Sequence, residues 1–154
     1  MGKKKRKPNT GTIANRRAGF DYNLGSDEYT FGIILTGPET KSLRMGRGQL
    51  TASYIILKDG KLLLFNAKIH PLQTNMSNFD ESTVERSREL LANKKELLEI
   101  EKQIKNGKSL IPTKFLTHRK YIKVIAKMGE GRKKYDKRLK LRRNADHKEI
   151  IRSL

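Results

Sequence analysis

Two apolar segments on either side of Asp59-Gly60 place the strongest constraint on how this chain folds. Residues 53–58 and 61–69 are rich in Ile, Leu, Tyr and Phe, the residue types that favour strands. Asp and Gly both tolerate a positive φ, which a tight primed turn between antiparallel strands requires. The sequence therefore predicts a β-hairpin at this place.

Three further segments have the composition of strands. Residues 30–36 are a β-branched and aromatic run that Gly37-Pro38 closes. Residues 109–117 contain Pro112, which cannot donate a backbone hydrogen bond and so indicates an edge strand or a bulge. In residues 121–128 the side chains alternate between two faces. One face holds Ile122, Val124, Ala126 and Met128, and the other holds Tyr121, Lys123, Ile125 and Lys127.

Two segments have helical features. Pro38 suits the first turn of a short helix over residues 39–45, which Gly46 ends. From Ser82 onward apolar residues recur at intervals of seven, which places them on one face of a helix. A capping box at its start and Asn106-Gly107 at its end predict one long helix that covers a sheet; bundle packing is the alternative. The apolar stripe consists of Val84, Leu90, Leu91, Leu97, Leu98 and Ile104, and the capping pair is Ser82 with Glu85.

These elements define the expected fold class. A chain of 154 residues has too few residues for a second core, and closing the strands into a barrel hides their edges. We expect a mainly β fold with helices: a small closed OB-like antiparallel barrel over residues 15–129, flanked by one long and one or two short helices. A basic arm, residues 1–14, precedes the barrel. A basic tail, residues 130–154, follows it and is expected to be disordered when free.

Both ends of the chain are strongly basic. The first 20 residues hold seven Lys or Arg and no acid, and the last 25 hold ten against four acids. The net charge of +19 exceeds what solubility requires. Each phosphate that Lys or Arg neutralises releases condensed counterions. Nucleic acid is therefore the first partner to consider.

Several other classes of protein are disfavoured by what the sequence lacks. The absence of cysteine excludes disulfides, thiolate zinc sites and Cys nucleophiles. No segment approaches the roughly 20 apolar residues of a membrane span, and no signal peptide follows Met1, so we expect a cytoplasmic, monomeric protein without a membrane partner. The histidines lack metal-ligand spacing. We predict no catalytic residue, cofactor or metal site; a metal-dependent nuclease using His70 and Asp80 is the enzymatic alternative.

Basic residues form three clusters around the expected barrel. Asn15-Arg16-Arg17 precedes the first strand, Lys41 and Arg44 share one helix face, and residues 132–138 open the tail. Arg grips phosphate oxygens with paired hydrogen bonds, and an interleaved aromatic ring can stack on an unpaired base. On strand 121–128, Lys123 and Lys127 beside Tyr121 could do the same, although an ordinary solvated face explains them equally well.

Six short motifs occur along the chain in a family-specific order. They are Asn15-Arg-Arg-Ala, Gly32-Ile-Ile-Leu-Thr-Gly, Glu39-Thr-Lys-Ser-Leu-Arg, Ser53-Tyr, Asn66-Ala-Lys-Ile-His-Pro and Lys133-Lys-Tyr-Asp-Lys-Arg. From about Asn15 to the C-terminus the chain resembles the SsrA-binding protein family, SmpB. The resemblance implies an OB-like barrel that binds the tRNA-like domain of transfer-messenger RNA and brings it to stalled bacterial ribosomes. It also implies a basic tail that enters the vacant decoding region of the small subunit.

The resemblance assigns roles to individual residues. Glu39 would lie at the RNA surface, where a carboxylate can accept from a guanine edge or orient a neighbouring Arg; helix capping is its alternative role. Tyr135 stands where the family usually has His. A basic structural ribosomal protein is the competing function. The expected RNA-binding residues are Asn15, Arg16, Arg17, Glu39, Lys41, Arg44, Lys123 and Lys127, and the expected ribosome-binding tail residues are Arg132, Lys133, Lys134, Tyr135, Asp136, Lys137 and Arg138.

Overall fold

Strands make up most of the ordered structure. The computed structural model describes residues 11–71, 83–131, 138 and 141–145. The strands are β1 (Thr12–Ala14), β2 (Tyr22–Ile33), β3 (Gly48–Gln49), β4 (Tyr54–Lys58), β5 (Lys61–Phe65), β6 (Lys68–Ile69), β7 (Arg88–Leu91), β8 (Ser109–Leu116) and β9 (Lys123–Gly131). Three helices accompany them within residues 11–131 as described: α1 (Ala18–Asp21), α2 (Gly37–Arg44) and α3 (Lys94–Lys105).

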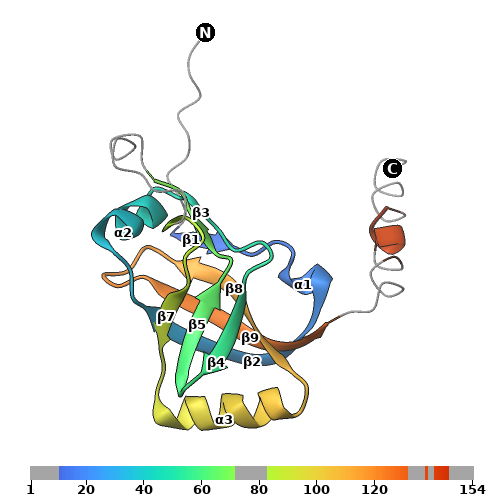
Figure 1. The fold of residues 1–154 in the computed structure, drawn as a ribbon. Coiled ribbons are helices and arrows are strands. Elements are labelled where there is room, and N and C mark those ends of the chain that lie inside the picture. Colours follow the sequence, from blue (N-terminus) through green and yellow to red (C-terminus); the bar gives the residue numbers. More distant parts are fainter. Residues whose placement is uncertain (1–10, 72–82, 132–137, 139–140, 146–154) are drawn as a thin grey trace.

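The main sheet curls into a barrel-like ring (Figure 1). Its strand order is β1-β8-β4-β5-β7-β2-β9, every pairing is antiparallel, and β8 also pairs with β9. That additional pairing joins β9 back to β8 and completes a ring of six strands, while β1 pairs with β8 outside the ring. At one seam, between β4 and β8, the paired residues are Ile55 and Leu110. The expected OB-like β architecture is confirmed as a barrel-like ring of strands.

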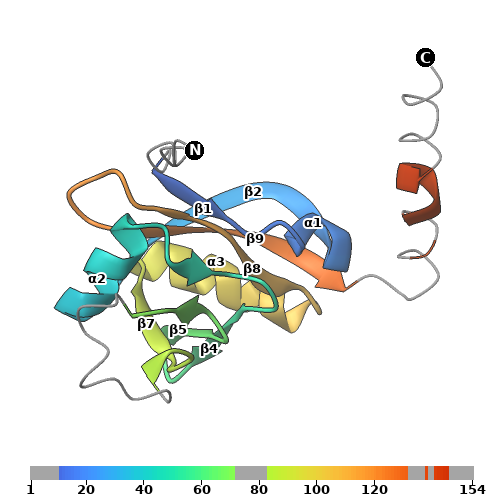
Figure 2. The ribbon, with the colours of Figure 1, turned by 90° about the horizontal axis from the view of Figure 1, so that it is seen from above.

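The interior of the ring is the hydrophobic core. Alternate side chains of the strands point inward, and Phe31, Leu64, Phe115 and Val124 are fully buried there. Helix α3 covers one end of the ring, at the bottom of Figure 1. Its residue Ile100 is also fully buried. Helices α1 and α2 lie at opposite ends of β2, as Figures 1 and 2 show.

The hairpin expected around Asp59-Gly60 is confirmed. Strands β4 and β5 pair from Tyr54–Phe65 down to Lys58–Lys61. Asp59 and Gly60 have φ values of 51° and 74°, which are the left-handed values of a primed two-residue turn. The bulge expected near Pro112 is confirmed as well, because the β8–β9 register shifts between Pro112 and Lys114.

The first long strand differs from the expected one. Strand β2 runs from Tyr22 to Ile33, whereas the sequence predicted residues 30–36. The N-terminal half of β2 contains Gly25, Ser26 and Asp27, which carry little strand signal. Pairing with β9 over most of its length holds this half extended. Residues 34–36 instead lead into α2, where the Thr36 hydroxyl accepts from the Glu39 backbone.

The prediction of one long helix from Ser82 is wrong for its first half and confirmed for its second half. Residues 88–91 form strand β7, which pairs with β5 and with β2. Strand pairing outweighs the helical spacing here, because without β7 the edges of β5 and β2 would remain unpaired. Helix α3 starts at Lys94, and the Glu96 carboxylate accepts from the Asn93 backbone nitrogen at 3.2 Å. The capping residue proposed from the sequence, Ser82, lies outside the described residues.

A small part of the tail is described. Arg138 and residues 141–145 are helical, and the disorder expected of the free tail stays a prediction. Leu141 is 56% exposed, so this turn rests on local preference rather than on packing; Leu, Arg and Ala are good helix formers. Strand β9 extends to Gly131, two residues past the expected end of the barrel at 129.

Candidate nucleic-acid interface

Helix α2 is tied to the β8–β9 loop by Arg44. Its Nη1 donates to the carbonyl oxygens of Thr117 and Arg119, both at 3.0 Å, and its Nη2 donates to that of Lys120 at 2.8 Å. One guanidinium therefore satisfies three carbonyls of a loop that has few partners of its own. This fixes the backbone from which Lys120 and Tyr121 project.

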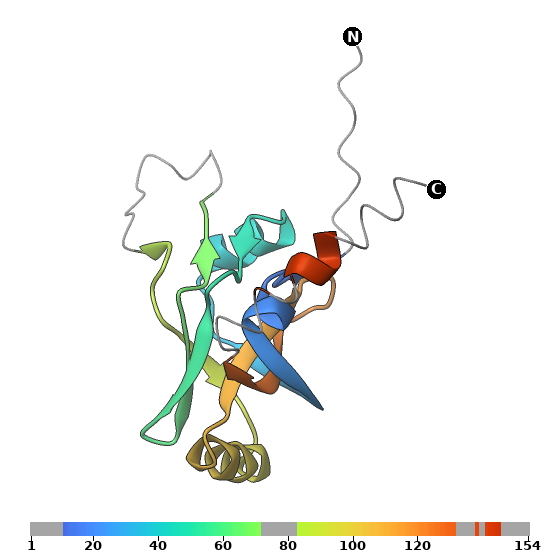
Figure 3. The same cartoon turned by 90° about the vertical axis from the view of Figure 1, so that its right-hand side faces the viewer.

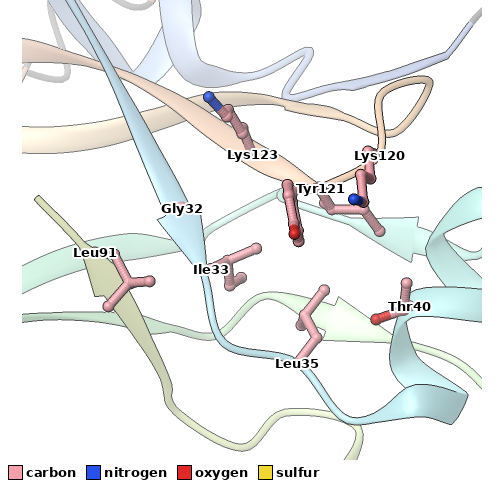
Figure 4. Close-up of a pocket in the computed structure, with 9 residues that line it drawn as sticks. Gly32, Ile33, Leu35, Thr40, Leu91, Lys120, Tyr121 and Lys123 are labelled. Atoms are coloured by element: carbon pink, nitrogen blue, oxygen red, sulfur yellow. The ribbon is translucent and has the colours of Figure 1, made fainter.

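A groove of about 430 Å³ opens beside this loop (Figure 4). Strands β2, β7 and β9, the β8–β9 loop and the first half of α2 all contribute to it. Figure 4 shows Tyr121 projecting toward the space bounded by Ile33, Leu35 and Thr40. The lining residues are Gly32, Ile33, Leu35, Thr40, Leu91, Lys120, Tyr121, Ile122 and Lys123.

The groove combines stacking surface with positive charge. Tyr121 is 69% exposed, and Leu91 on the opposite wall is 55% exposed. The Lys120 ammonium lies 5.5 Å from the centroid of the Tyr121 ring, and Lys123 follows two residues later. An exposed ring between two lysines can stack on an unpaired base while the ammonium groups contact the flanking phosphates. This is the most RNA-like constellation among the described residues.

Glu39 is held inside the protein by two arginines. Its carboxylate accepts from Arg86 and, at 2.6 Å, from Nε of Arg88. It also accepts from the backbone nitrogen of Thr36 at 3.0 Å and so caps α2. Burial by itself raises the pKa of Glu39, but the hydrogen bonds from Arg86, Thr36 and Arg88 outweigh it and lower the pKa below its ordinary value. Both alternative roles considered for Glu39, orienting an Arg and capping a helix, are present.

Arg88 is the hub of this cluster. Its side chain is fully buried, and burial lowers its pKa although Glu39 opposes the shift. A buried guanidinium is tolerated when its donors are satisfied. Besides Glu39, its acceptors are the carbonyl oxygens of Ala67, Thr83, Val84 and Arg86. Arg88 therefore joins β7, α2 and the segment that follows β5.

The first predicted cluster lies between β1 and α1, with Asn15 hydrogen-bonded to β8, and does not line the groove. Asn15 donates from Nδ2 to the Pro112 carbonyl at 2.9 Å and from its backbone nitrogen to Thr113 at 2.7 Å, which satisfies the β8 bulge. Its Oδ1 is buried without a hydrogen-bond partner among the described residues. Arg16 is exposed. Arg17 is exposed too and contacts Asp21 and the ring of Phe20.

The other predicted residues have mixed environments. Lys41 is exposed on α2. Lys123 lines the groove, whereas the Lys127 ammonium lies 4.0 Å from the Glu28 carboxylate. The face that carries them is less open than expected, because Ile125 between them is 5% exposed. Of the predicted tail residues, Arg138 is exposed, and residues 132–137 lie outside the described part of the chain.

Sequence reasoning overlooked several residues of this region. Lys120 could have been found, since Arg119-Lys120-Tyr121 is a short basic run next to an aromatic residue. Arg88 had no such signal, because a charged residue beside two leucines looks like the polar face of a helix. Within residues 11–71 and 83–131 no group of three or more His, Asp or Glu is placed to hold a metal. No helix in the described part of the chain is long and apolar enough to cross a membrane.

Comparisons with known proteins agree on one family. The profile of the family described as SmpB protein matches residues 12–154. An SsrA-binding protein of Phocaeicola vulgatus is 36% identical over 148 residues, which are 95% of this chain and 97% of that protein. An SsrA-binding protein of Pseudomonas putida W619 is 37% identical over 156 residues, covering 100% of this chain and 96% of that protein. A solved structure described as "tmRNA-SmpB: a journey to the center of the bacterial ribosome" matches with a TM-score of 0.65 and 34% identity, over 81% of this chain and 87% of that one.

Proposed function

The chain belongs to the SmpB protein family, and from this premise we propose that it binds the tRNA-like domain of transfer-messenger RNA and delivers it to stalled bacterial ribosomes. Rescue of the ribosome and tagging of the unfinished peptide would follow. The protein acts by binding and positioning RNA, without a catalytic residue or a cofactor. A ribosomal site of action implies a cytoplasmic protein.

The groove beside the β8–β9 loop is the observation that carries this proposal. It offers Tyr121 at 69% exposure together with Lys120 and Lys123, the combination that recognises an unstacked base and its phosphates. The tRNA-like domain has loops in which bases can be unpaired, whereas a perfect duplex would present none. We therefore assign Lys120, Tyr121 and Lys123 to direct contact with the loops of the tRNA-like domain.

The residues named by the family motifs divide into two groups in this proposal. Arg16, Arg17 and Lys41 are exposed and are proposed to contact phosphates, for which Arg17 would exchange its contact with Asp21. Glu39 and Arg44 hold the RNA-binding surface in shape through internal hydrogen bonds. In the tail, residues 132–138 are proposed to bind the decoding-region RNA of the small ribosomal subunit, with Tyr135 as a stacking ring.

Sequencing of the RNA that copurifies with the full-length chain from a bacterial lysate tests the proposal. One RNA with tRNA-like and message-like parts should dominate. A uniform association with all ribosomes would favour the competing ribosomal protein, and a broad spectrum of RNAs would contradict the proposal. RNA cleavage that a chelator abolishes would favour the nuclease.

A pair of matched variants shows whether the groove is responsible. Lys120→Gln with Lys123→Gln should reduce recovery of this RNA. Lys95→Gln with Lys102→Gln removes the same charge from exposed positions on α3 and should leave recovery unchanged. An equal effect of the two double variants would mean that overall charge, rather than the groove, determines binding.

A further inference from the structure

The outer face of the β4–β5 hairpin is unusual for a solvent-facing sheet. Its inward residues, such as Ile55 and Leu64, belong to the core. The outward residues form three pairs, each directly across from the other: Tyr54 with Phe65, Ile56 with Leu63, and Lys58 with Lys61. A sheet with one wet face normally alternates apolar and polar residues. Here two of the three outward pairs are apolar, and we call this six-residue surface the hairpin face.

The aromatic pair of the hairpin face is accessible. Tyr54 is 36% exposed and Ile56 is 41% exposed. The rings of Tyr54 and Phe65 lie 5.6 Å apart between centroids and are inclined by 10°, so they form a two-ring stack with its outer surface open. Figure 3 shows the turn end of the hairpin at the lower left edge of the molecule.

Two lysines face each other at the other end of the hairpin. Like charges directly across a strand pair destabilise it. Lys61 is partly compensated by Glu89, whose carboxylate lies 3.8 Å from its ammonium. Lys58 is exposed and makes no ion pair among the described residues. The free protein therefore carries an exposed apolar surface and an uncompensated positive charge on one short hairpin.

We propose that the hairpin face is a second RNA-binding surface, which takes a single-stranded segment with an unpaired base stacked on Tyr54 and Phe65 and a phosphate at Lys58. About 14 Å separates the two ends of the face along the strand, at ~3.4 Å per residue, and a few nucleotides span this distance. An RNA strand relieves both unfavourable features at once. A second copy of the chain would bring its own Lys58 and Lys61 and a further net charge of +19.

The hairpin face and the groove are built from different residues. None of the six residues of the hairpin face lines the groove. The two surfaces are neighbours, because β7, which carries the groove residue Leu91, pairs with β5. Since the two sets of residues do not overlap, we assign the hairpin face to a different RNA segment from the one in the groove. This inference rests on the proposed function in one respect: it takes the tRNA-like domain to be the RNA that occupies the groove.

The test uses the full-length chain saturated with the isolated tRNA-like domain, followed by titration with a fluorescent six-nucleotide oligoadenylate. The oligonucleotide should bind this complex. Tyr54→Leu with Phe65→Leu should weaken that binding about tenfold, in line with the loss of one stacked base, without changing affinity for the tRNA-like domain. Lys58→Gln, which preserves the apolar surface, should weaken it about threefold and reduce its salt dependence. Tyr121→Leu is the matched aromatic control and should leave it unchanged.

Each outcome decides a different question. If the complex with the tRNA-like domain does not form, the proposed function fails, and oligoadenylate binding to the free Tyr121→Leu protein then tests the hairpin face alone. Equal oligoadenylate affinity of wild type and the Tyr54/Phe65 variant overturns the second surface. Two other results would also overturn the second surface. In each, the Tyr54/Phe65 variant keeps its oligoadenylate affinity but loses another property of the wild type, either self-association or binding to phosphatidylserine vesicles.

Discussion

A guanidinium nitrogen of Arg44 lies 2.8 Å from the backbone oxygen of Lys120, 76 residues further along the chain. Arg44 is in the last turn of α2, and Lys120 is in the loop that carries the groove residues. The same side chain also donates to the carbonyls of Thr117 and Arg119. Arg44, an exposed residue of α2, therefore holds the loop that carries the groove residues in place.

Replacing Arg44 with Gln should loosen the β8–β9 loop and weaken RNA binding. Three hydrogen bonds from a charged donor are lost, each contributing about 1.5 to 3 kcal/mol at most, and Lys120 and Tyr121 are no longer fixed. We expect faster amide hydrogen exchange over residues 117–121 and about tenfold lower affinity for the tRNA-like domain. Lys41→Gln, on the same helix but exposed, is the control and should not change exchange in the loop. Unaltered exchange in Arg44→Gln would contradict the positioning role.

Glu39 should make stability depend on pH. Its pKa in the folded protein is below the ordinary value of 4.5, so its carboxylate favours folding above that value. This contribution is lost as pH falls through the lowered pKa. Glu39→Gln should destabilise the protein by about 3 kcal/mol near pH 7, because Arg88 loses its buried partner.

Denaturant unfolding of both proteins from pH 7 to pH 3 measures this effect. The difference between wild type and Glu39→Gln should shrink as the pH falls below 4.5, the ordinary pKa, toward the lowered pKa of the folded protein. Glu101→Gln removes an exposed carboxylate that pairs with Lys105 on α3 and should change stability by about 0.5 kcal/mol or less. A Glu39→Gln difference that stays constant across this range would rule out the ionised pair as its source.

Local signals in the sequence were sufficient for the elements that depend on local geometry. The Asp59-Gly60 turn requires only two residues with positive φ, and the inward alternation of residues 122–128 requires only period two. Strand β7 depends on partners distant in sequence, because Arg88 to Leu91 extend only where the edges of β5 and β2 meet them. Their leucines had been assigned to a helix whose spacing they fitted by coincidence.

The candidate site shows the same division. The motifs identified Glu39 and Arg44, but their partners, Arg88 and the carbonyls of the β8–β9 loop, become visible only when the chain is folded. Sequence gives the type of a charged residue and not the direction in which it points. For that reason both residues were predicted to face RNA, although their hydrogen bonds are directed into the protein.

The true apolar stripe of α3 can be tested by two substitutions in one helix. Ile100 is fully buried at the end of the ring, whereas Leu98 is 60% exposed, although the sevenfold spacing had included Leu98 and omitted Ile100. Ile100→Ala should lower the free energy of unfolding by about 2 to 4 kcal/mol. Leu98→Ala should change it by about 0.5 kcal/mol or less. Urea unfolding of the two variants checks this, and a larger effect of Leu98→Ala would contradict the packing of α3.

Groove lysines should contribute to the salt dependence of RNA binding. Each Lys that neutralises a phosphate of single-stranded RNA adds about 0.7 to the slope of log affinity against log salt. Lys120→Gln with Lys123→Gln should therefore reduce that slope by about 1.4 in titrations with the tRNA-like domain. Lys95→Gln with Lys102→Gln should leave the slope unchanged. An unchanged slope in the groove variant would mean that Lys120 and Lys123 do not contact phosphates.

The tail should be needed on the ribosome and dispensable for binding the tRNA-like domain. Lys137, Arg138 and their neighbours lie beyond β9, the last strand of the ring, whereas the groove is built from elements that end at Gly131. Changing Asp136, Lys137 and Arg138 together to Ala removes charge only from the tail. Binding in a gel shift should stay within about threefold of wild type, while peptide tagging on stalled ribosomes is abolished. Truncation after Gly131 should give the same pair of results, since it leaves the ring intact. If either protein tags normally, or if both lose RNA binding together with tagging, then the ring and the tail do not have separate roles.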